Sequence, residues 1–364
     1  MASHSIPIHA IKGRGTATRM AHRFSQDARE GFDDGWDGLD TQAQEQGEAL
    51  PPHTQVRFED AKSIITANDS PDIFFDYSIN PYRGCEHGCV YCFARPTHSY
   101  LGLSPGLDFE TQIIAKRNIA QVLRQELAKP SYVPKLLNIG SATDCYQPVE
   151  RELRLTRSVI ALLGEVKHPY SLLTKSSAVE LDIDLIAAHA QHKRAAAYVS
   201  ITTLDGQLAR ILEPRAAAPH RRLRTIRALA QAGIPVGVSV APQIPFINED
   251  MEQVLEAARE AGAQTAFYTV LRLPWEINAL FQQWLQLHYP QRAERVMARV
   301  RDMRGGKDYN SAWGQRMKGD GLWADLLRQR FQKTCARLGL NRVRHELDLS
   351  QFAPPALDGQ ERLF

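Results

Sequence analysis

The chain has 364 residues, of which 43% are hydrophobic, 23% charged and 8% aromatic, as in an ordinary globular protein. This length exceeds a usual single core, although one α/β barrel domain runs past about 200 residues. The formal net charge of +3 is too small to indicate a partner by itself. The sequence has no run of about 18 apolar residues and no apolar core of a secretory signal near its start, so we expect no membrane segment and a cytoplasmic location.

The first part of the chain, residues 1–75, shows little hydrophobic periodicity. Such a segment does not bury enough apolar surface to form a core of its own. We therefore expect an N-terminal arm that is partly disordered or draped over the surface. Phe24, Phe32 and Trp36 are the aromatic side chains that can attach this arm to the rest of the protein.

From about residue 76, short β-branched or apolar runs alternate with amphipathic stretches. The predicted strands are residues 77–80, 135–140, 171–174, 197–202, 236–241 and 266–271, and the predicted helices are 152–166, 182–192, 219–232, 251–261 and 276–288. The run 111–127 fits a further strand followed by a helix. This alternation predicts parallel strands joined by right-handed crossovers, either in a doubly wound sheet or in a partial barrel. In both folds the functional site lies at the carboxyl ends of the strands.

The last part of the chain, residues 276–364, differs in charge. Between residues 291 and 344 it has 14 Lys or Arg against five Asp or Glu. Interleaved with Tyr309, Trp313 and Trp323, this charge can bind a phosphate backbone and stack on bases. The alternative is a solvated helical surface. We expect a basic helical C-terminal extension that covers the open side of the cavity.

Three of the five cysteines, Cys85, Cys89 and Cys92, fall within eight residues just after the first predicted strand. So sparse and clustered a set favours a ligand site in a reducing compartment over a disulfide framework. Cubane iron–sulfur clusters ordinarily take four cysteines, so three would leave one iron open for a small-molecule ligand. The alternative is a zinc site with His87 or His98 as fourth ligand, although zinc ligands usually arrive as two separated pairs.

The spacing Cys-x3-Cys-x2-Cys, with Tyr91 before the last cysteine, resembles the signature of the radical S-adenosylmethionine (radical SAM) superfamily. The wider string NPYRGCEHGCVYCFAR resembles the branch related to spore photoproduct lyase. The resemblance covers about residues 76–275 and implies a core that is a partial (βα)6 TIM-like barrel. It also implies a [4Fe-4S] cluster whose open iron binds S-adenosylmethionine, so that one electron cleaves the sulfonium to a 5′-deoxyadenosyl radical.

Polar residues at the ends of the second and third predicted strands are candidates for binding S-adenosylmethionine. Ser141, Thr143 and Asp144 can receive the ammonium of the cofactor, although an ordinary turn explains them as well. Lys175 can neutralise a ligand carboxylate. In the lyase-like branch, the matching lysine contacts the carboxylate of the cofactor.

The fourth strand and the loop after it supply further candidates. Alternation places Ser200 and Thr202 on one face of the strand, and the resemblance implies a contact with the ribose or carboxylate. Glu213 can meet the ribose or the charged end, or it is an exposed glutamate before a helix. The resemblance places Tyr91 near the adenine, with packing of the loop as its alternative role.

Cys145 is a candidate catalytic residue, because the lyase uses a cysteine near this strand to donate a hydrogen atom. The match is not clean, since Cys145 follows Asp144 whereas the lyase cysteine precedes its serine, and Ser141 can occupy that place instead. A small buried side chain is the alternative.

We therefore expect a radical SAM enzyme of lyase or transferase type that is reduced by a donor such as flavodoxin or ferredoxin. Its expected substrate is a nucleic-acid base or lesion in DNA or RNA, an inference that rests on the basic extension and on analogy. A peptide or small-molecule substrate is the second hypothesis. A zinc-stabilised nucleic-acid-binding module without catalysis is the third.

Overall fold

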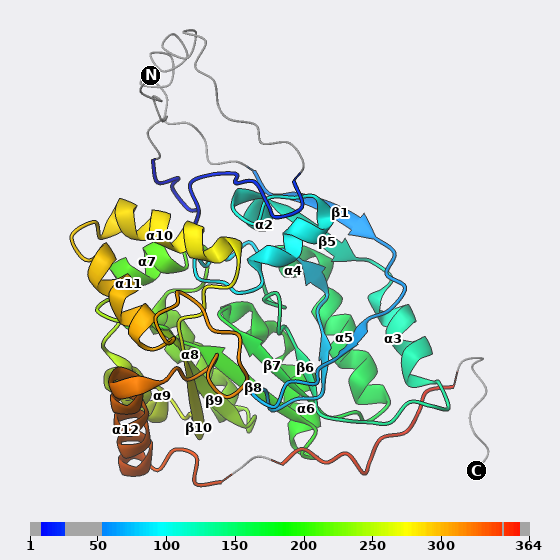
Figure 1. The fold of residues 1–364 in the computed structure, drawn as a ribbon. Coiled ribbons are helices and arrows are strands. Elements are labelled where there is room, and N and C mark those ends of the chain that lie inside the picture. The colour runs from blue at the N-terminus through cyan, green and yellow to red at the C-terminus, as the bar shows by residue number, and fades with distance from the viewer. Residues whose placement is uncertain (1–8, 26–52, 344–345, 357–364) are drawn as a thin grey trace.

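The computed structural model describes residues 9–25, 53–343 and 346–356. Its main body is a curved sheet with helices on its outer face (Figure 1). Two of the aromatic anchors expected in the N-terminal arm, Phe32 and Trp36, lie outside the described residues.

The main sheet has seven strands in the order β10-β9-β8-β7-β6-β3-β2. Their bounds are β2 Ile65–Ala67, β3 Tyr77–Ile79, β6 Leu137–Ile139, β7 Tyr170–Thr174, β8 Ala195–Ser200, β9 Val236–Gln243 and β10 Thr265–Val270. In this sheet β3, β6, β7, β8, β9 and β10 pair in parallel, and β2 pairs antiparallel with β3 at the edge. These six parallel strands are the six predicted ones, and each end lies within two residues of its predicted place.

The strand order decides between the two architectures that the sequence leaves open. Each parallel strand lies beside the next one in the chain, without the reversal of a doubly wound sheet. The core is therefore a partial TIM-like barrel.

Helices from the crossovers cover the outer face of the sheet (Figure 1). They are α3 Ile119–Leu127, α5 Leu155–Glu165, α6 Ile183–Ala190, α8 Pro219–Gln231 and α9 Met251–Glu260. On β8, Ala197 and Val199 belong to the hydrophobic core beneath these helices. Alternation puts Tyr198 and Ser200 on the opposite face of the strand.

Short elements surround the mouth of the barrel. They are the helices η1 Arg95–Leu101, α2 Leu107–Thr111, α4 Glu150–Leu153, η2 Ser177–Asp182 and α7 Gly206–Leu212, and the strands β1 Gln55–Glu59, β4 Tyr82–Arg83 and β5 Gln112–Lys116. The three strands form a separate small sheet in the order β1-β5-β4. The strand-then-helix prediction for 111–127 is confirmed by β5 and α3, whereas β1, β2 and β4 are not predicted.

Three longer helices follow the barrel: α10 Glu276–His288, α11 Ala293–Asp302 and α12 Gly321–Leu338. α10 and α11 lie beside α7 at the end of the molecule where the N-terminal segment is also found (Figure 1). A second hydrophobic core joins Tyr91, Leu212, Phe281 and Trp284, so these helices pack against the cysteine loop. None of the helices in the described ranges combines the length and the apolar character that crossing a bilayer requires.

The open side of the barrel lies between β10 and the segment that leads into β3. The backbone N–H of Val270 donates to the carbonyl of Met317 at 2.9 Å, and Lys318 donates to the carbonyl of Tyr268 at 2.7 Å, so residues 317–318 lie against β10. Arg316 and Gly314 both bind the carboxylate of Asp72, each at 2.7 Å. These contacts join the two margins of the barrel and protect a free sheet edge.

Much of the positive charge of the C-terminal extension is neutralised within the fold. Six of its arginines form ion pairs: Arg299 with Asp302, Arg301 with Glu294, Arg316 with Asp72, Arg328 with Asp325, Arg330 with Glu252 and Arg337 with Glu256. Two of these pairs fasten α12 to α9. The basic excess along the sequence is therefore only partly an excess of charge at the surface.

Candidate functional site

The cysteine loop follows β3 and β4 at the carboxyl end of the barrel. Cys85 and Cys89 are buried, Cys92 is half-buried, and none of the three forms a disulfide. The N–H of Cys85 donates to the carbonyl of Phe109 at 2.9 Å, and the N–H of Cys92 donates to that of Cys89 at 3.2 Å. The loop is thus a fixed turn that holds three free thiols.

Two glycines are required for this turn. Gly84 and Gly88 have φ angles of 79° and 67°, which L-residues with a side chain rarely adopt. A Cβ at Gly84 would lie 2.9 Å from the carbonyl of Phe109, and one at Gly88 would lie 2.7 Å from the carboxylate of Glu110. The loop therefore cannot take larger residues at these positions without moving its supports.

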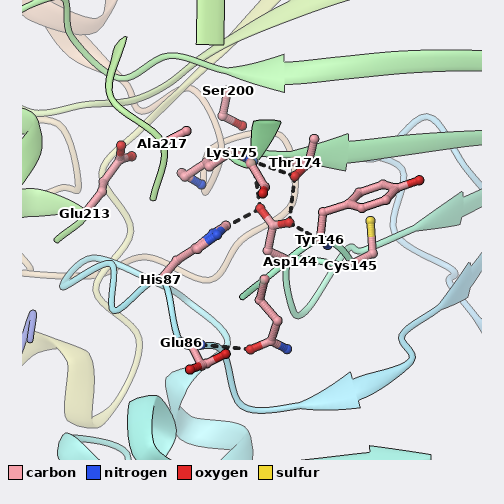
Figure 2. Close-up of polar contacts among 12 residues, drawn as sticks. Glu86, His87, Asp144, Cys145, Tyr146, Thr174, Lys175, Ser200, Glu213 and Ala217 are labelled. Atoms are coloured by element: carbon pink, nitrogen blue, oxygen red, sulfur yellow. Dashed lines mark hydrogen bonds and ion pairs between the residues drawn. The ribbon is translucent and has the colours of Figure 1, made fainter. Parts of the chain in front are cut away.

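His87, between the first two cysteines, ties the loop to two strand ends (Figure 2). Its Nδ1 lies 3.2 Å from the Asp144 carboxylate, and both side chains are buried. Asp144 also accepts from the Thr174 hydroxyl and from the Lys175 N–H, both at 2.7 Å. Burial alone would raise the pKa of Asp144, but His87 and these hydrogen bonds hold that pKa well below its usual value.

Lys175 reaches the site from the end of β7. Its Nζ lies 5.8 Å from the centre of the Tyr91 ring and has no hydrogen-bond acceptor within the described part of the chain. Burial opposes the positive charge, but Cys89, Glu213 and Asp144 outweigh it and raise the pKa of Lys175. The structure thus places a charged ammonium group beside the cysteine loop.

Glu213 is buried, whereas one of the two interpretations above made it an exposed glutamate. Its carboxylate accepts from the hydroxyls of Tyr91 and Thr202 and pairs with the guanidinium of Arg222. Burial favours the neutral acid, yet Arg222 and Lys175 lower the pKa of Glu213 to about 2. Glu213 therefore fixes the ring of Tyr91 and compensates a buried arginine.

The other predicted residues of the second strand end are held by local contacts. Ser141 accepts from the side-chain amide of Asn80 at 3.3 Å, and Thr143 donates to the carbonyl of Tyr82 at 3.4 Å. Cys145 is fully buried in the main core, and its Sγ lies 3.9 Å from two backbone carbonyls. Its surroundings are those of a packed small side chain.

Ser200 is also buried, and its carbonyl accepts from Arg222 at 3.0 Å. No side-chain hydrogen bond joins Ser200 to Lys175 or Asp144 among the described residues. Lys175 and Asp144, predicted from two different strand ends, come together next to His87 of the cysteine loop (Figure 2).

Sequence reasoning missed a buried support beneath the loop. Arg95 donates to the carbonyls of Cys89 and Gly88 at 2.9 and 3.0 Å and pairs with Glu110 at 2.6 Å. Arg95 and Glu110 are both fully buried. Arg95 ends the quoted string NPYRGCEHGCVYCFAR, but neither Arg95 nor Glu110 belongs to a periodic pattern, and the sequence indicated no role for either.

The N-terminal segment contributes to the same support. Residues 14–24, here called the N-terminal strap, lie along α2 and α10. The backbone N–H groups of Gly15 and Thr16 donate to the Glu110 carboxylate at 2.9 and 3.0 Å. A Cβ at Gly15 would lie 1.6 Å from the carbonyl oxygen of Gly88. The strap therefore contacts the cysteine loop directly.

The two histidines considered as zinc ligands are engaged elsewhere. His87 pairs with Asp144, and Nε2 of His98 lies 3.0 Å from the carbonyl of Gln112. Among the described residues, no three His, Cys, Asp or Glu side chains lie close enough together to hold a single metal ion.

A family model described as the Radical SAM superfamily matches residues 79–261, which is half of the chain. The chain belongs to the Radical SAM superfamily. Radical SAM proteins use a [4Fe-4S] cluster and S-adenosylmethionine. Three free thiols on a loop whose turn depends on Gly84 and Gly88 fit the cluster, and the charged Lys175 beside them fits the carboxylate of S-adenosylmethionine.

Relatives and solved structures are similar to this chain in sequence or in fold. An uncharacterized protein of Mycobacterium tuberculosis is 38% identical over 224 residues, which are 61% of this chain and 66% of the relative, just under two thirds of its length. One of Methanocaldococcus jannaschii is 26% identical over 220 residues, which are 60% of this chain and 79% of that protein.

Among solved structures, a spore photoproduct lyase complexed with dinucleoside spore photoproduct superposes with a TM-score of 0.55 at 15% identity, over 84% of this chain and 92% of the lyase. A double mutant of the lyase with bound AdoMet gives a TM-score of 0.53 at 16% identity, over 78% of this chain and 80% of that one. At this identity the similarity shows a shared radical SAM fold.

Proposed function

We propose that this chain is an enzyme that cleaves S-adenosylmethionine reductively and removes a hydrogen atom from a substrate. The observation that carries the proposal is the convergence of Lys175 with three free thiols, Cys85, Cys89 and Cys92, at the carboxyl end of the barrel. When bound, the reduced cluster and S-adenosylmethionine supply one-electron chemistry that yields a hydrogen-abstracting radical.

The protein's own residues bind and orient in this proposal. Burial raises the pKa of the Cys89 thiol to about 12, with Lys175 opposing, so the thiolate form depends on bound iron. Lys175 receives the carboxylate of S-adenosylmethionine by charge. Ser141 and Ser200 offer hydroxyls at the ends of β6 and β8, on either side of β7, and Tyr91, held by Glu213, offers a fixed ring next to the last cysteine.

Water exclusion is the second contribution of the fold. The N-terminal strap and the α10 side of the second core both pack against the cysteine loop. A closed site limits the contact of a reactive radical with solvent. An oxygen-sensitive cluster suits the reducing cytoplasm, with flavodoxin or ferredoxin as the electron donor.

The type of reaction is a lyase or transferase step on an organic substrate. A nucleic-acid base is one candidate, supported by the fold shared with spore photoproduct lyase, whose solved structures hold a dinucleoside spore photoproduct. Binding to DNA or RNA through phosphates weakens steeply with salt. An affinity for oligonucleotides that is equal at low and high salt would exclude this candidate and favour a peptide or small molecule.

The proposal is tested by isotope transfer. The anaerobically reconstituted full chain is reduced with dithionite and incubated with S-adenosylmethionine and a perdeuterated cell extract. Deuterium is expected in the 5′-deoxyadenosine that forms, because hydrogen abstraction moves it from the substrate. 5′-deoxyadenosine that stays unlabelled with extracts of several organisms would contradict the abstraction step. A colourless protein with stoichiometric zinc would contradict the cluster.

A further inference from the structure

Arg272 is a cation at the mouth of the barrel whose charge nothing in the described chain compensates. It lies two residues beyond β10, at the carboxyl end where the site is built. Its Nε is buried without a hydrogen-bond partner in the described chain, and one of its terminal nitrogens lies 3.3 Å from the Met317 sulfur. A buried donor without an acceptor is costly, so this guanidinium is suited to an anionic ligand.

Two buried arginines at this end of the barrel have carboxylate partners. Arg95 pairs with Glu110, and Arg222 pairs with Glu213. Arg272 forms no ion pair within the described ranges. Arg272 therefore lacks the counter-charge that Arg95 and Arg222 have.

Two neighbouring cations strengthen the positive field around Arg272. Arg304 donates to the carbonyl of Leu271 at 2.7 Å, and burial and Arg272 together lower the pKa of Arg304. Lys318 donates to the carbonyl of Tyr268, also at 2.7 Å. No carboxylate compensates either of them, since backbone carbonyls are their hydrogen-bond acceptors within the described chain.

Phe93 provides an apolar surface at the same place. It follows Cys92 directly, is 48% exposed, and has the Arg272 guanidinium carbon 5.0 Å from its ring centre. An exposed aromatic ring beside a guanidinium offers a ligand both packing surface and bidentate hydrogen bonds to an oxyanion.

Arg272 and Lys175 lie on different sides of the mouth. Lys175 follows β7 and Arg272 follows β10, and β8 and β9 separate these strands in the sheet. A carboxylate of S-adenosylmethionine held at Lys175 therefore leaves Arg272 free for a second molecule.

We propose that Arg272 and Phe93 form a subsite for the substrate, which takes a phosphate or carboxylate attached to an aromatic or apolar group. Calling this ligand the substrate rests on the proposed function. The binding itself requires neither reduction nor S-adenosylmethionine.

The test is ligand-observed NMR on the reconstituted full chain, with phenyl phosphate and benzoate as probes and benzyl alcohol as their neutral counterpart. The wild type is expected to bind one of the two anions more tightly than benzyl alcohol, and the preferred anion identifies the oxyanion. Arg272→Gln is expected to weaken that binding at least tenfold. Arg272→Lys keeps the positive charge but loses the paired N–H donors of the guanidinium, and it is expected to weaken the binding of the anion less than Arg272→Gln does.

Arg328→Gln is the matched control, because it removes the same charge from an exposed arginine of α12. It is expected to bind like the wild type. Equal affinity of Arg272→Gln and the wild type would overturn the inference, as would a wild type that binds neither anion better than benzyl alcohol. A chain that binds the anion but never cleaves S-adenosylmethionine would contradict the proposed function alone, and the reverse result would contradict the subsite alone.

Discussion

Glu213 shows how a polar group at the site also stabilises the fold. Its carboxylate faces Tyr91, Thr202 and Arg222 in a buried environment. Glu213→Gln leaves the Arg222 guanidinium buried without a counter-charge, so the free energy of unfolding is expected to fall by about 3–5 kcal/mol. Denaturant titration checks this. The control Glu256→Gln, from an exposed ion pair, is expected to cost less than about 1 kcal/mol, and equal losses would contradict the account.

Lys175 carries the cofactor prediction at the residue scale. Lys175→Met keeps the length of the side chain but removes its charge, so the affinity for S-adenosylmethionine is expected to fall at least tenfold, or about 1.4 kcal/mol. Equilibrium binding to the oxidised, cluster-loaded protein measures it. Lys135→Met, at an exposed position before β6, is expected to bind like the wild type. An unchanged affinity of Lys175→Met for S-adenosylmethionine would show that Lys175 does not bind this cofactor.

His168 makes the stability depend on pH. Burial lowers the pKa of His168 from 6.5 to about 4, and its ring nitrogens contact the Tyr132 hydroxyl and the Pro169 carbonyl. The unfolded chain takes up a proton below pH 6.5 and the folded protein does not, so the stabilisation present above 6.5 is lost as the pH falls towards 4. At pH 5 the loss from this group is about 2 kcal/mol.

His168→Gln is expected to reduce the difference in unfolding free energy between pH 7.5 and pH 5, measured by urea titration. His220→Gln, at an exposed histidine, is expected to leave that difference as it is in the wild type. An identical pH dependence in His168→Gln and the wild type would show that this ring titrates normally in the folded protein.

At the same scale, the sequence predicted the residues that belong to a motif or to a strand end and missed those that support them. The cysteines and Lys175 follow predicted strands, so their common place could be inferred from parallel topology. Glu110 and Arg272 act through contacts with backbone and side chains that are distant in sequence, and Arg95 ends the quoted motif, which indicates no role for it. Such contacts leave no periodic signal.

At the scale of elements, the success of the prediction depended on burial. The six parallel strands are apolar because helices cover one face, and their composition marked them. β1 is mostly exposed and β4 has two residues, so neither carries a hydrophobic pattern. The N-terminal strap is held by backbone hydrogen bonds to Glu110 and has no periodicity to detect.

The strap supplies a test at this scale. A methyl group at position 15 would overlap the Gly88 carbonyl, so Gly15→Ala is expected to lift the strap and weaken the cysteine loop. The reconstituted variant is expected to lose iron and its visible absorbance faster in air than the wild type. Gly206→Ala is the control, because a Cβ there meets no atom within 4 Å. Equal rates of iron loss in the wild type, Gly15→Ala and Gly206→Ala would show that the strap does not support the cysteine loop.

At the scale of the whole molecule, the C-terminal extension changes its expected role. We predicted a basic surface over the open side of the barrel, and of this extension Met317 and Lys318 bond to β10. However, Arg316, Arg330 and Arg337 are paired with acids of the barrel and its loops. A count of charges along a sequence cannot show which of them form ion pairs in the folded protein. Arg272, which has no ion pair in the described chain, lies outside the basic stretch 291–344.

The central claim is that the cysteine loop and Lys175 form a reductive S-adenosylmethionine site. The most direct measurement is the yield of 5′-deoxyadenosine from the dithionite-reduced, cluster-loaded full chain and from the matched Cys89→Ser variant. The account predicts 5′-deoxyadenosine and methionine in equal amounts from the wild type and neither above background from the variant. A wild-type protein with a full complement of iron that binds S-adenosylmethionine and leaves it intact after reduction would contradict the account.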